Sequence, residues 1–187
     1  MLSPNFTPFP ILETERLVLR KVGLTDLNEL FFLRSDPTVI KYLDKAPATS
    51  LTEVSDFLKK ITDLKDSGDA VDWAITLKDD PKLIGTICLW NINKEHYRAE
   101  IGYALHLDYH GKGIMQEAVL RVLNYGFRII GLHSIEATVN PSNIASIKLL
   151  EKNNFAREGY YRENYFFNGK FLDTAVYSLL KTEFSIL

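Results

Sequence analysis

The segment of residues 108–118, with the sequence DYHGKGIMQEA, combines a basic side chain with two glycines where a helix is expected to begin. Lys112 lies between Gly111 and Gly113, and apolar residues with helical spacing follow at once. A strand-like run, IGYAL, precedes the segment. A strand, a glycine turn and a helix in this order present free backbone N–H groups and a positive helix dipole at one point. The segment therefore predicts a binding site for a phosphate or pyrophosphate group.

The spacing of these glycines differs from that of two common nucleotide-binding motifs. The G-x-x-x-x-G-K-[ST] pattern of nucleoside-triphosphate loops is absent, and no third glycine completes the G-x-G-x-x-G pattern of dinucleotide-binding folds. A glycine pair before a helix is also an ordinary turn in many proteins. The order of the surrounding elements is therefore needed to interpret the segment.

Composition and charge narrow the classes of protein to be considered. The 187 residues suit one domain, residues 1–187, with a sizeable core. The formal net charge of -2, without a Lys/Arg cluster, argues against nucleic-acid binding. No signal peptide or long apolar stretch is found, so a cytoplasmic location without membrane insertion is expected. The single cysteine, Cys88, excludes an internal disulfide, and no Cys/His cluster has metal-ligand spacing, so no metal is expected.

The spacing of apolar residues predicts strands and helices that alternate only in the centre of the chain. This order indicates a mixed α/β (α+β) sheet. Asn140 is expected to cap a helix, with Pro141 at its first position. The pair Asn168-Gly169 between aromatic runs predicts a two-residue hairpin. The expected strands cover residues 14–22, 71–77, 83–91, 97–105, 135–139, 160–167 and 170–181, and the expected helices cover about 25–33, a brief turn to 42, 50–68, 114–130 and 140–154.

Five segments of the chain resemble a known family. They are TERLVLRKVGLTDL, SDPTVIKYL, AEIGYAL, DYHGKGIMQEA and NPSNIASIKLLEKNNF. Together they cover nearly the whole chain, in the order found in the family. DYHGKGIMQEA resembles the acetyl-CoA pyrophosphate loop of the GNAT N-acetyltransferase superfamily. The other four resemble its RimJ/RimL-type branch, which acetylates ribosomal-protein N-termini. The resemblance implies a twisted, mostly antiparallel seven-stranded sheet, flanked by helices and splayed between its fourth and fifth strands. It also implies acetyl-CoA as cosubstrate, bound in that split.

The resemblance also assigns contacts with acetyl-CoA. Pantetheine amides would add to the strand edge at Leu105 and Leu107, and the pyrophosphate would lie on the amides of residues 111–115. Backbone N–H groups and a lysine can neutralise such phosphates without any change of protonation. The expected cofactor-binding residues are Leu105, Leu107, His110, Gly111, Lys112, Gly113, Ile114, Met115, Asn140 and Asn143.

Acetylation of an amine requires a neutral amine beside the thioester carbonyl and a proton for the leaving thiolate. Glu100 is the candidate base, because on a regular strand it shares a face with Gly102 and Ala104, whose small side chains leave room beside the carboxylate. The alternative for Glu100 is a solvated carboxylate or one paired with Arg98.

The residues offer several candidates for the proton donor. Many members of the superfamily have a tyrosine where this chain has Leu150, so that tyrosine cannot donate the proton here. The resembling branch places at Ser146 a serine proposed to protonate the thiolate, one helical turn after Asn143. The alternative for Ser146 is a small packing residue. Further possible donors are Tyr103, Tyr165 and Tyr177.

These inferences predict an acetyl-CoA-dependent N-acetyltransferase that acts on a primary amine by direct attack in a ternary complex. A protein N-terminal α-amine, with a pKa near 8, is about one-tenth neutral at pH 7 and is mildly favoured as acceptor over a lysine side chain. One alternative is a small-molecule acceptor, such as a polyamine or an aminoglycoside. Another is a noncatalytic acyl-CoA-binding module, which Leu150 leaves open. A monomer and a homodimer are both compatible with the sequence.

Overall fold

The computed structural model describes residues 1–185, and this part of the chain forms an eight-stranded sheet with the order β1-β2-β3-β4-β5-β6-β8-β7. All neighbouring strands are antiparallel except β5 and β6, which are parallel. The strands are β1 (Leu12–Glu13), β2 (Leu17–Lys21), β3 (Val71–Leu77), β4 (Asp80–Asn93), β5 (Arg98–Leu105), β6 (Ser134–Val139), β7 (Ala156–Phe167) and β8 (Lys170–Leu180). The expected fold class is confirmed. The eighth strand is β1, whose two residues are too few to show an alternating pattern.

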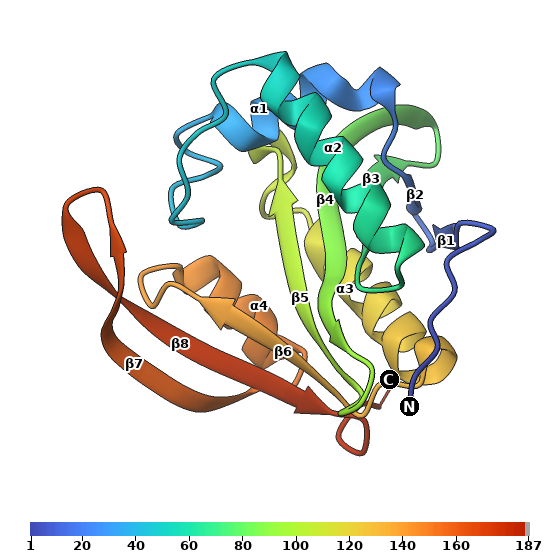
Figure 1. Cartoon of the computed structure of the whole chain (residues 1–187), viewed down its shortest axis with the longest axis vertical. Coiled ribbons are helices and arrows are strands. Elements are labelled where there is room, and N and C mark those ends of the chain that lie inside the picture. The colour runs from blue at the N-terminus through green and yellow to red at the C-terminus, as the bar shows by residue number, and fades with distance from the viewer. Residues whose placement is uncertain (186–187) are drawn as a thin grey trace.

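Helices cover both faces of the sheet (Figure 1). Helices α1 (Leu27–Ser35) and α2 (Leu51–Asp66) enclose a smaller core with Ala74 of β3 on one face. Helix α3 (Ile114–Tyr125), continued by a π-helical turn (Gly126–Ile130), packs on the other face in the main core, together with Leu150 of α4 (Ile144–Lys152). Because side chains alternate between the faces of a strand, residues of β5 project alternately toward these two layers.

Helix α2 illustrates how local sequence sets these elements. Its N-cap Ser50 accepts a hydrogen bond from the N–H of Glu53, and the carboxylate of Glu53 accepts one from the N–H of Thr49. The first of these bonds satisfies a donor that the first helical turn leaves free, and the second fixes the residue before the cap. The helix then buries Val54, Leu58 and Ile61, which are spaced at helical intervals.

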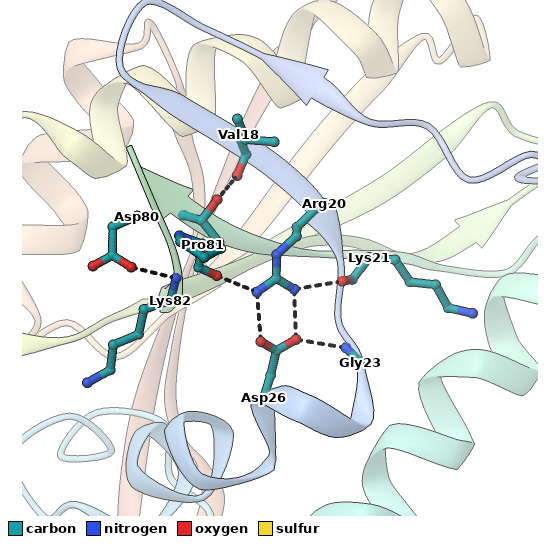
Figure 2. A network of polar contacts seen from close by, with 9 residues as sticks. Val18, Arg20, Lys21, Gly23, Asp26, Asp80, Pro81 and Lys82 are labelled. Carbon is teal, nitrogen blue, oxygen red and sulfur yellow. Dashed lines mark hydrogen bonds and ion pairs between the residues drawn. The ribbon is translucent and has the colours of Figure 1, made fainter. Parts of the chain in front are cut away.

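A buried ion pair holds the segment before α1 against the sheet (Figure 2). The guanidinium of Arg20 makes two hydrogen bonds to the carboxylate of Asp26, at 2.7 and 2.8 Å, and a third to the carbonyl of Pro81. Asp26 also accepts from the N–H of Gly23 and is 4% exposed. Two-point contacts of this kind fix orientation as well as distance. The pair therefore ties the end of β2, the segment before α1 and the start of β4 together.

Strands β5 and β6 pair only at one end. The register joins Arg98, Ala99 and Glu100 to residues 134–136, and it ends there although β5 continues to Leu105. Beyond Glu100 the two strands diverge (Figure 1). These are the strands expected to be fourth and fifth, so the predicted splay is present at the predicted place.

One local expectation is wrong and two are confirmed. Asn140 is not the cap of α4, because the helix begins at Ile144 and its N-cap is Asn143. The brief turn expected up to Tyr42 is present: the N–H of Ile40 donates to the carbonyl of Asp36 at 3.0 Å, and a second turn follows at residues 41–43. The Asn168-Gly169 hairpin is present: Phe167 pairs with Lys170, and both turn residues have positive φ.

Within residues 1–185, none of the helices is long and apolar enough to cross a membrane. In the same part of the chain, no group of three or more His, Cys, Asp or Glu side chains is arranged to hold a metal ion.

Candidate active site

The glycine turn before α3 leaves a set of backbone donors free. Gly111 and Gly113 have φ values of 72° and 73°, in the left-handed region that glycine adopts most easily, and Gly113 is the N-cap of α3. In the described chain, the N–H groups of residues 111–115 donate to no acceptor, and the first helical bond runs from Glu117 to the carbonyl of Gly113. A side chain at Gly111 would meet no atom within 4 Å. The turn can therefore accept an anionic group on several N–H donors.

The side chain of Arg16 supports this turn from the far end of the sequence. Its guanidinium donates to the carbonyl of Lys112 at 3.0 Å and to the carboxylate of Glu117 at 2.6 Å. Glu117 also accepts from the N–H of Arg16 and from the hydroxyl of Thr14. Burial alone would raise the pKa of Glu117, but these hydrogen bonds lower it overall. Arg16 therefore ties the glycine turn to the first turn of α3 through one carbonyl and one carboxylate.

The end of β5 meets the turn through His110. The Nε2 atom of His110 lies 3.0 Å from the carbonyl oxygen of Leu105, so that oxygen already has a partner. Because the N–H of His106 donates to the carbonyl of Ile84 on β4, the alternation along the strand directs the N–H of Leu105 to the other side of β5, where β6 has separated. Leu107 differs from the expected extended edge, since β5 ends at Leu105 and Leu107 begins a short 3-10 helix. An extended ligand can thus form backbone hydrogen bonds with the edge of β5 at Leu105 but not at Leu107.

Glu100 lies at the point where β5 and β6 separate, because Glu100 and Glu136 are the last paired residues. Arg98 pairs with Glu136 and not with Glu100, so the ion-paired alternative for Glu100 is excluded. Burial raises the pKa of Glu100, and hydrogen bonds from Thr138 and Asn91 oppose that shift only in part. A partly buried carboxylate with a raised pKa is well suited to accept a proton.

Ser146 lies on α4, across the split from β5. The hydroxyl oxygen of Ser146 lies 2.7 Å from the phenolic oxygen of Tyr103 on β5. The N–H of Ser146 donates to the side-chain carbonyl of its N-cap, Asn143, at 3.2 Å. The side-chain oxygen of Asn143 is therefore used as the helix cap, and the expected contact of this residue with pantetheine stays a prediction. Both residues lie at the end of α4 that faces the split.

Glu100 and Ser146 approach the split from opposite faces of the sheet. Glu100 shares its face with Ala104, which is in register with Thr86 and, through it, with Ala74 in the α1–α2 layer. Tyr103 projects to the other face and packs on the main core with α3. A thioester threaded between β5 and β6 would therefore meet the carboxylate on one side and the serine hydroxyl on the other.

Asp44 bridges the far side of the split. Its carbonyl accepts a hydrogen bond from the hydroxyl of Tyr165 at 2.9 Å, and its carboxylate lies 3.3 Å from the side-chain nitrogen of Asn140. Asn140 also accepts from the N–H of Ser142 and so forms a local turn. The segment before α2 is thereby connected to the β6–α4 turn and to the β7–β8 hairpin. Sequence patterns gave no sign of Asp44.

The family model described as "Acetyltransferase (GNAT) domain" matches residues 16–156 of the chain. The chain belongs to the GNAT acetyltransferase family. This GNAT protein is 41% identical over 174 residues to an uncharacterized N-acetyltransferase, p20, of Bacillus licheniformis, with 93% of this chain and 98% of the other covered. As a member of the family, the protein is an N-acetyltransferase, and acetyl-CoA is its acetyl donor.

Two solved structures of GNAT enzymes are similar over nearly the whole chain. One is spermidine N-acetyltransferase from Vibrio cholerae in complex with CoA and spermine, with a TM-score of 0.82 and 26% identity, covering 91% of this chain and 98% of the other. The second is ribosomal-protein-S5-alanine acetyltransferase from Vibrio fischeri, with a TM-score of 0.82 and 25% identity, covering 95% and 100%. The two relatives carry different acceptors in their names and resemble this GNAT enzyme equally well.

Replacing Arg16 by methionine is expected to weaken acetyl-CoA binding by about tenfold, equivalent to about 1.4 kcal/mol, because the side-chain hydrogen bonds to the Lys112 carbonyl and to Glu117 are lost. The Lys112 carbonyl then becomes free to rotate into the turn. Calorimetric titration with acetyl-CoA measures the change. Arg121→Met is the matched control, because Arg121 donates to the carbonyl of Glu13 at the same edge without touching the turn. Equal affinities for the two variants would show that Arg16 has no role in binding.

Proposed function

We propose that this GNAT enzyme acetylates the α-amine at the N-terminus of a polypeptide, as expected of the RimJ/RimL-type branch. The position of Lys45 carries the proposal. Its ammonium lies 6.0 Å from the ring centroid of Trp90, which is the cross-strand partner of Glu100. A positive charge beside Trp90, the cross-strand partner of the candidate base, raises the free energy of a further ammonium group on the acceptor. This arrangement opposes a polycation and tolerates a single amine that has lost its proton.

The pKa of the acceptor amine also supports an N-terminal α-amine as the acceptor. An α-amine with a pKa of about 8 is about one-tenth neutral at pH 7, whereas an alkylamine with a pKa of about 10.4 is neutral to less than a thousandth. The first amine needs only one carboxylate acting through a water molecule. Glu100 is such a carboxylate, and Glu136 beside it is already paired with Arg98.

In this proposal, each part of the site has one role in the transfer. The N–H groups of residues 111–115, with the ammonium of Lys112, hold the diphosphate, and the N–H of Leu105 binds a pantetheine amide. Glu100 accepts the proton that the amine loses, and the hydroxyl of Ser146 stabilises the departing thiolate. Residues proposed to line the rest of the donor path are Leu107, His110, Asn140 and Asn143, with Ile114 and Met115 supporting the turn from α3.

A panel of acceptors tests the proposal. We expect kcat/KM for short peptides with a free α-amine to exceed that for spermidine by at least about tenfold, a difference of roughly 1.4 kcal/mol. Free-thiol release from acetyl-CoA gives the rate, and mass spectrometry of the product identifies the acetylated nitrogen. The same peptides with a blocked N-terminus and an internal lysine serve as controls for side-chain acetylation.

Lys45→Met provides the matched variant for this experiment. If the Lys45 ammonium opposes polycations, the substitution raises kcat/KM for spermidine and leaves that for the peptides unchanged. A wild-type preference for spermidine would overturn the proposal and place the enzyme with its Vibrio cholerae relative as a polyamine acetyltransferase.

A further inference from the structure

The hydrogen bond between Tyr103 and Ser146 joins the two sides of the split. Tyr103 belongs to β5 and Ser146 to α4, and their oxygen atoms lie 2.7 Å apart. The phenol packs against the main core, so its position is fixed by its surroundings. Ser146 is held as well, because its N–H donates to Asn143 at the start of the helix. The pair therefore has a defined geometry on the face opposite Glu100.

The chemistry of the two hydroxyls sets the direction of this bond. A phenol is a stronger acid than an aliphatic alcohol, so Tyr103 is the better donor and the Ser146 oxygen is the better acceptor. When Tyr103 donates, Ser146 keeps its own proton for a second partner. A serine in a helix often returns that proton to the carbonyl four residues earlier. Ser146 forms no such bond within the described part of the chain, so its proton is available to the split.

We propose that Tyr103 is a positioning residue for acetyl transfer, which donates to the oxygen of Ser146 and thereby directs the Ser146 proton toward the sulfur of the thioester. The inference rests on the role proposed above for Ser146. It gives a function to a side chain that lies outside the position where many relatives carry a tyrosine, here occupied by Leu150. Tyr103 itself does not contact the reacting atoms.

The amine nitrogen forms a bond to the carbonyl carbon, the carbon–sulfur bond breaks, and its electron pair leaves with the sulfur. The proton lost by the nitrogen passes through water to Glu100 and then to solvent. The hydrogen bond from Ser146 stabilises the thiolate, which takes a proton from solvent after release. Burial raises the pKa of Tyr103 to about 12, so the phenol remains a protonated donor throughout the neutral range.

A double-mutant cycle with Tyr103→Phe and Ser146→Ala tests the inference. We expect Tyr103→Phe to lower kcat about tenfold, as the loss of one oriented hydrogen bond implies, with KM and Kd for acetyl-CoA unchanged within about twofold. In the Ser146→Ala background, the same substitution is expected to have no effect on kcat. A role in packing alone would lower kcat by the same factor in both backgrounds.

Tyr125→Phe is the matched control, because Tyr125 is another buried tyrosine of the main core and lies away from the split on α3. Its kcat is expected to stay at the wild-type value. Thermal unfolding of each variant reports whether the fold is kept. Equal effects of Tyr103→Phe in both backgrounds, or a Kd change that matches the kcat change, would overturn the inference. The acceptor panel uses the wild-type protein, so it tests the proposed α-amine specificity separately.

Discussion

Gly113→Asp is expected to weaken acetyl-CoA binding by about 100-fold or more, equivalent to about 2.7 kcal/mol. Two effects add. Gly113 has a φ of 73°, and a residue with a side chain is strained there by roughly 1–2 kcal/mol. The new carboxylate would also stand among the N–H donors proposed to hold the diphosphate, where the repulsion between like charges about 4 Å apart is on the order of 4 kcal/mol near a protein surface.

Gly113→Asn separates these effects, because asparagine has nearly the same shape, tolerates a left-handed backbone and carries no charge. We expect it to weaken binding by about fivefold, near 1 kcal/mol. A side chain at this position starts 3.5 Å from the guanidinium of Arg16, so aspartate would also compete for that group. Calorimetric titration of both variants measures the difference. If aspartate and asparagine bound acetyl-CoA equally well, the turn would not be the diphosphate site.

Glu100→Gln is expected to lower kcat by about 100-fold at pH 7, the range typical for the loss of a general base. The affinity for acetyl-CoA is expected to change little, because Glu100 lies on the face of the sheet opposite the Tyr103–Ser146 pair. The deficit should shrink toward pH 9, since an α-amine then loses its proton without help. Rates of thiol release at saturating substrates between pH 6 and 9 measure both effects. Equal kcat values across this range would remove Glu100 from the role of base.

The raised pKa of Glu100 also predicts how the rate and the stability of the fold depend on pH. As the pH falls through the raised pKa of Glu100, the base becomes protonated and the wild-type rate falls. Glu136→Gln is expected to move this fall in rate to lower pH, because the charge of Glu136 helps to raise the pKa of Glu100. A carboxyl group with a raised pKa binds protons more tightly in the folded state than in the unfolded state. Stability therefore falls as the pH rises through that window. Glu100→Gln should accordingly unfold at a slightly higher temperature than the wild type at pH 7.

The regular elements were predictable wherever a local pattern determines them. Residues 71–77 were predicted to the residue, because they are buried on β3 and bounded by polar turns. The hairpin was predictable because Asn168 and Gly169 both adopt positive φ. The start of α4 was not, since the sequence NPSN offers two asparagines. The side chain of Asn140 forms a local turn with Ser142, and that turn delays the helix until Asn143 caps it.

The candidate site was predictable in part for the same reason. The glycine turn and Glu100 have local signatures, namely a glycine pair before a helix and small residues on one strand face. Arg16 and Asp44 have none, because Arg16 acts on Lys112, 96 residues away, and Asp44 meets Tyr165, 121 residues away. The bond between Tyr103 and Ser146 likewise joins residues 43 positions apart. Such contacts arise only after the chain has folded, so one sequence cannot reveal them.

The early separation of β5 and β6 leaves two interior strands with backbone groups that their own sheet does not use. Unpaired strand edges of this kind promote aggregation, because they can pair with a strand of another molecule. A donor lodged there both shields those edges and stabilises the folded form by mass action. The enzyme is consequently expected to aggregate at a lower temperature without coenzyme A than with it. Light scattering during heating, with and without the coenzyme, measures the difference.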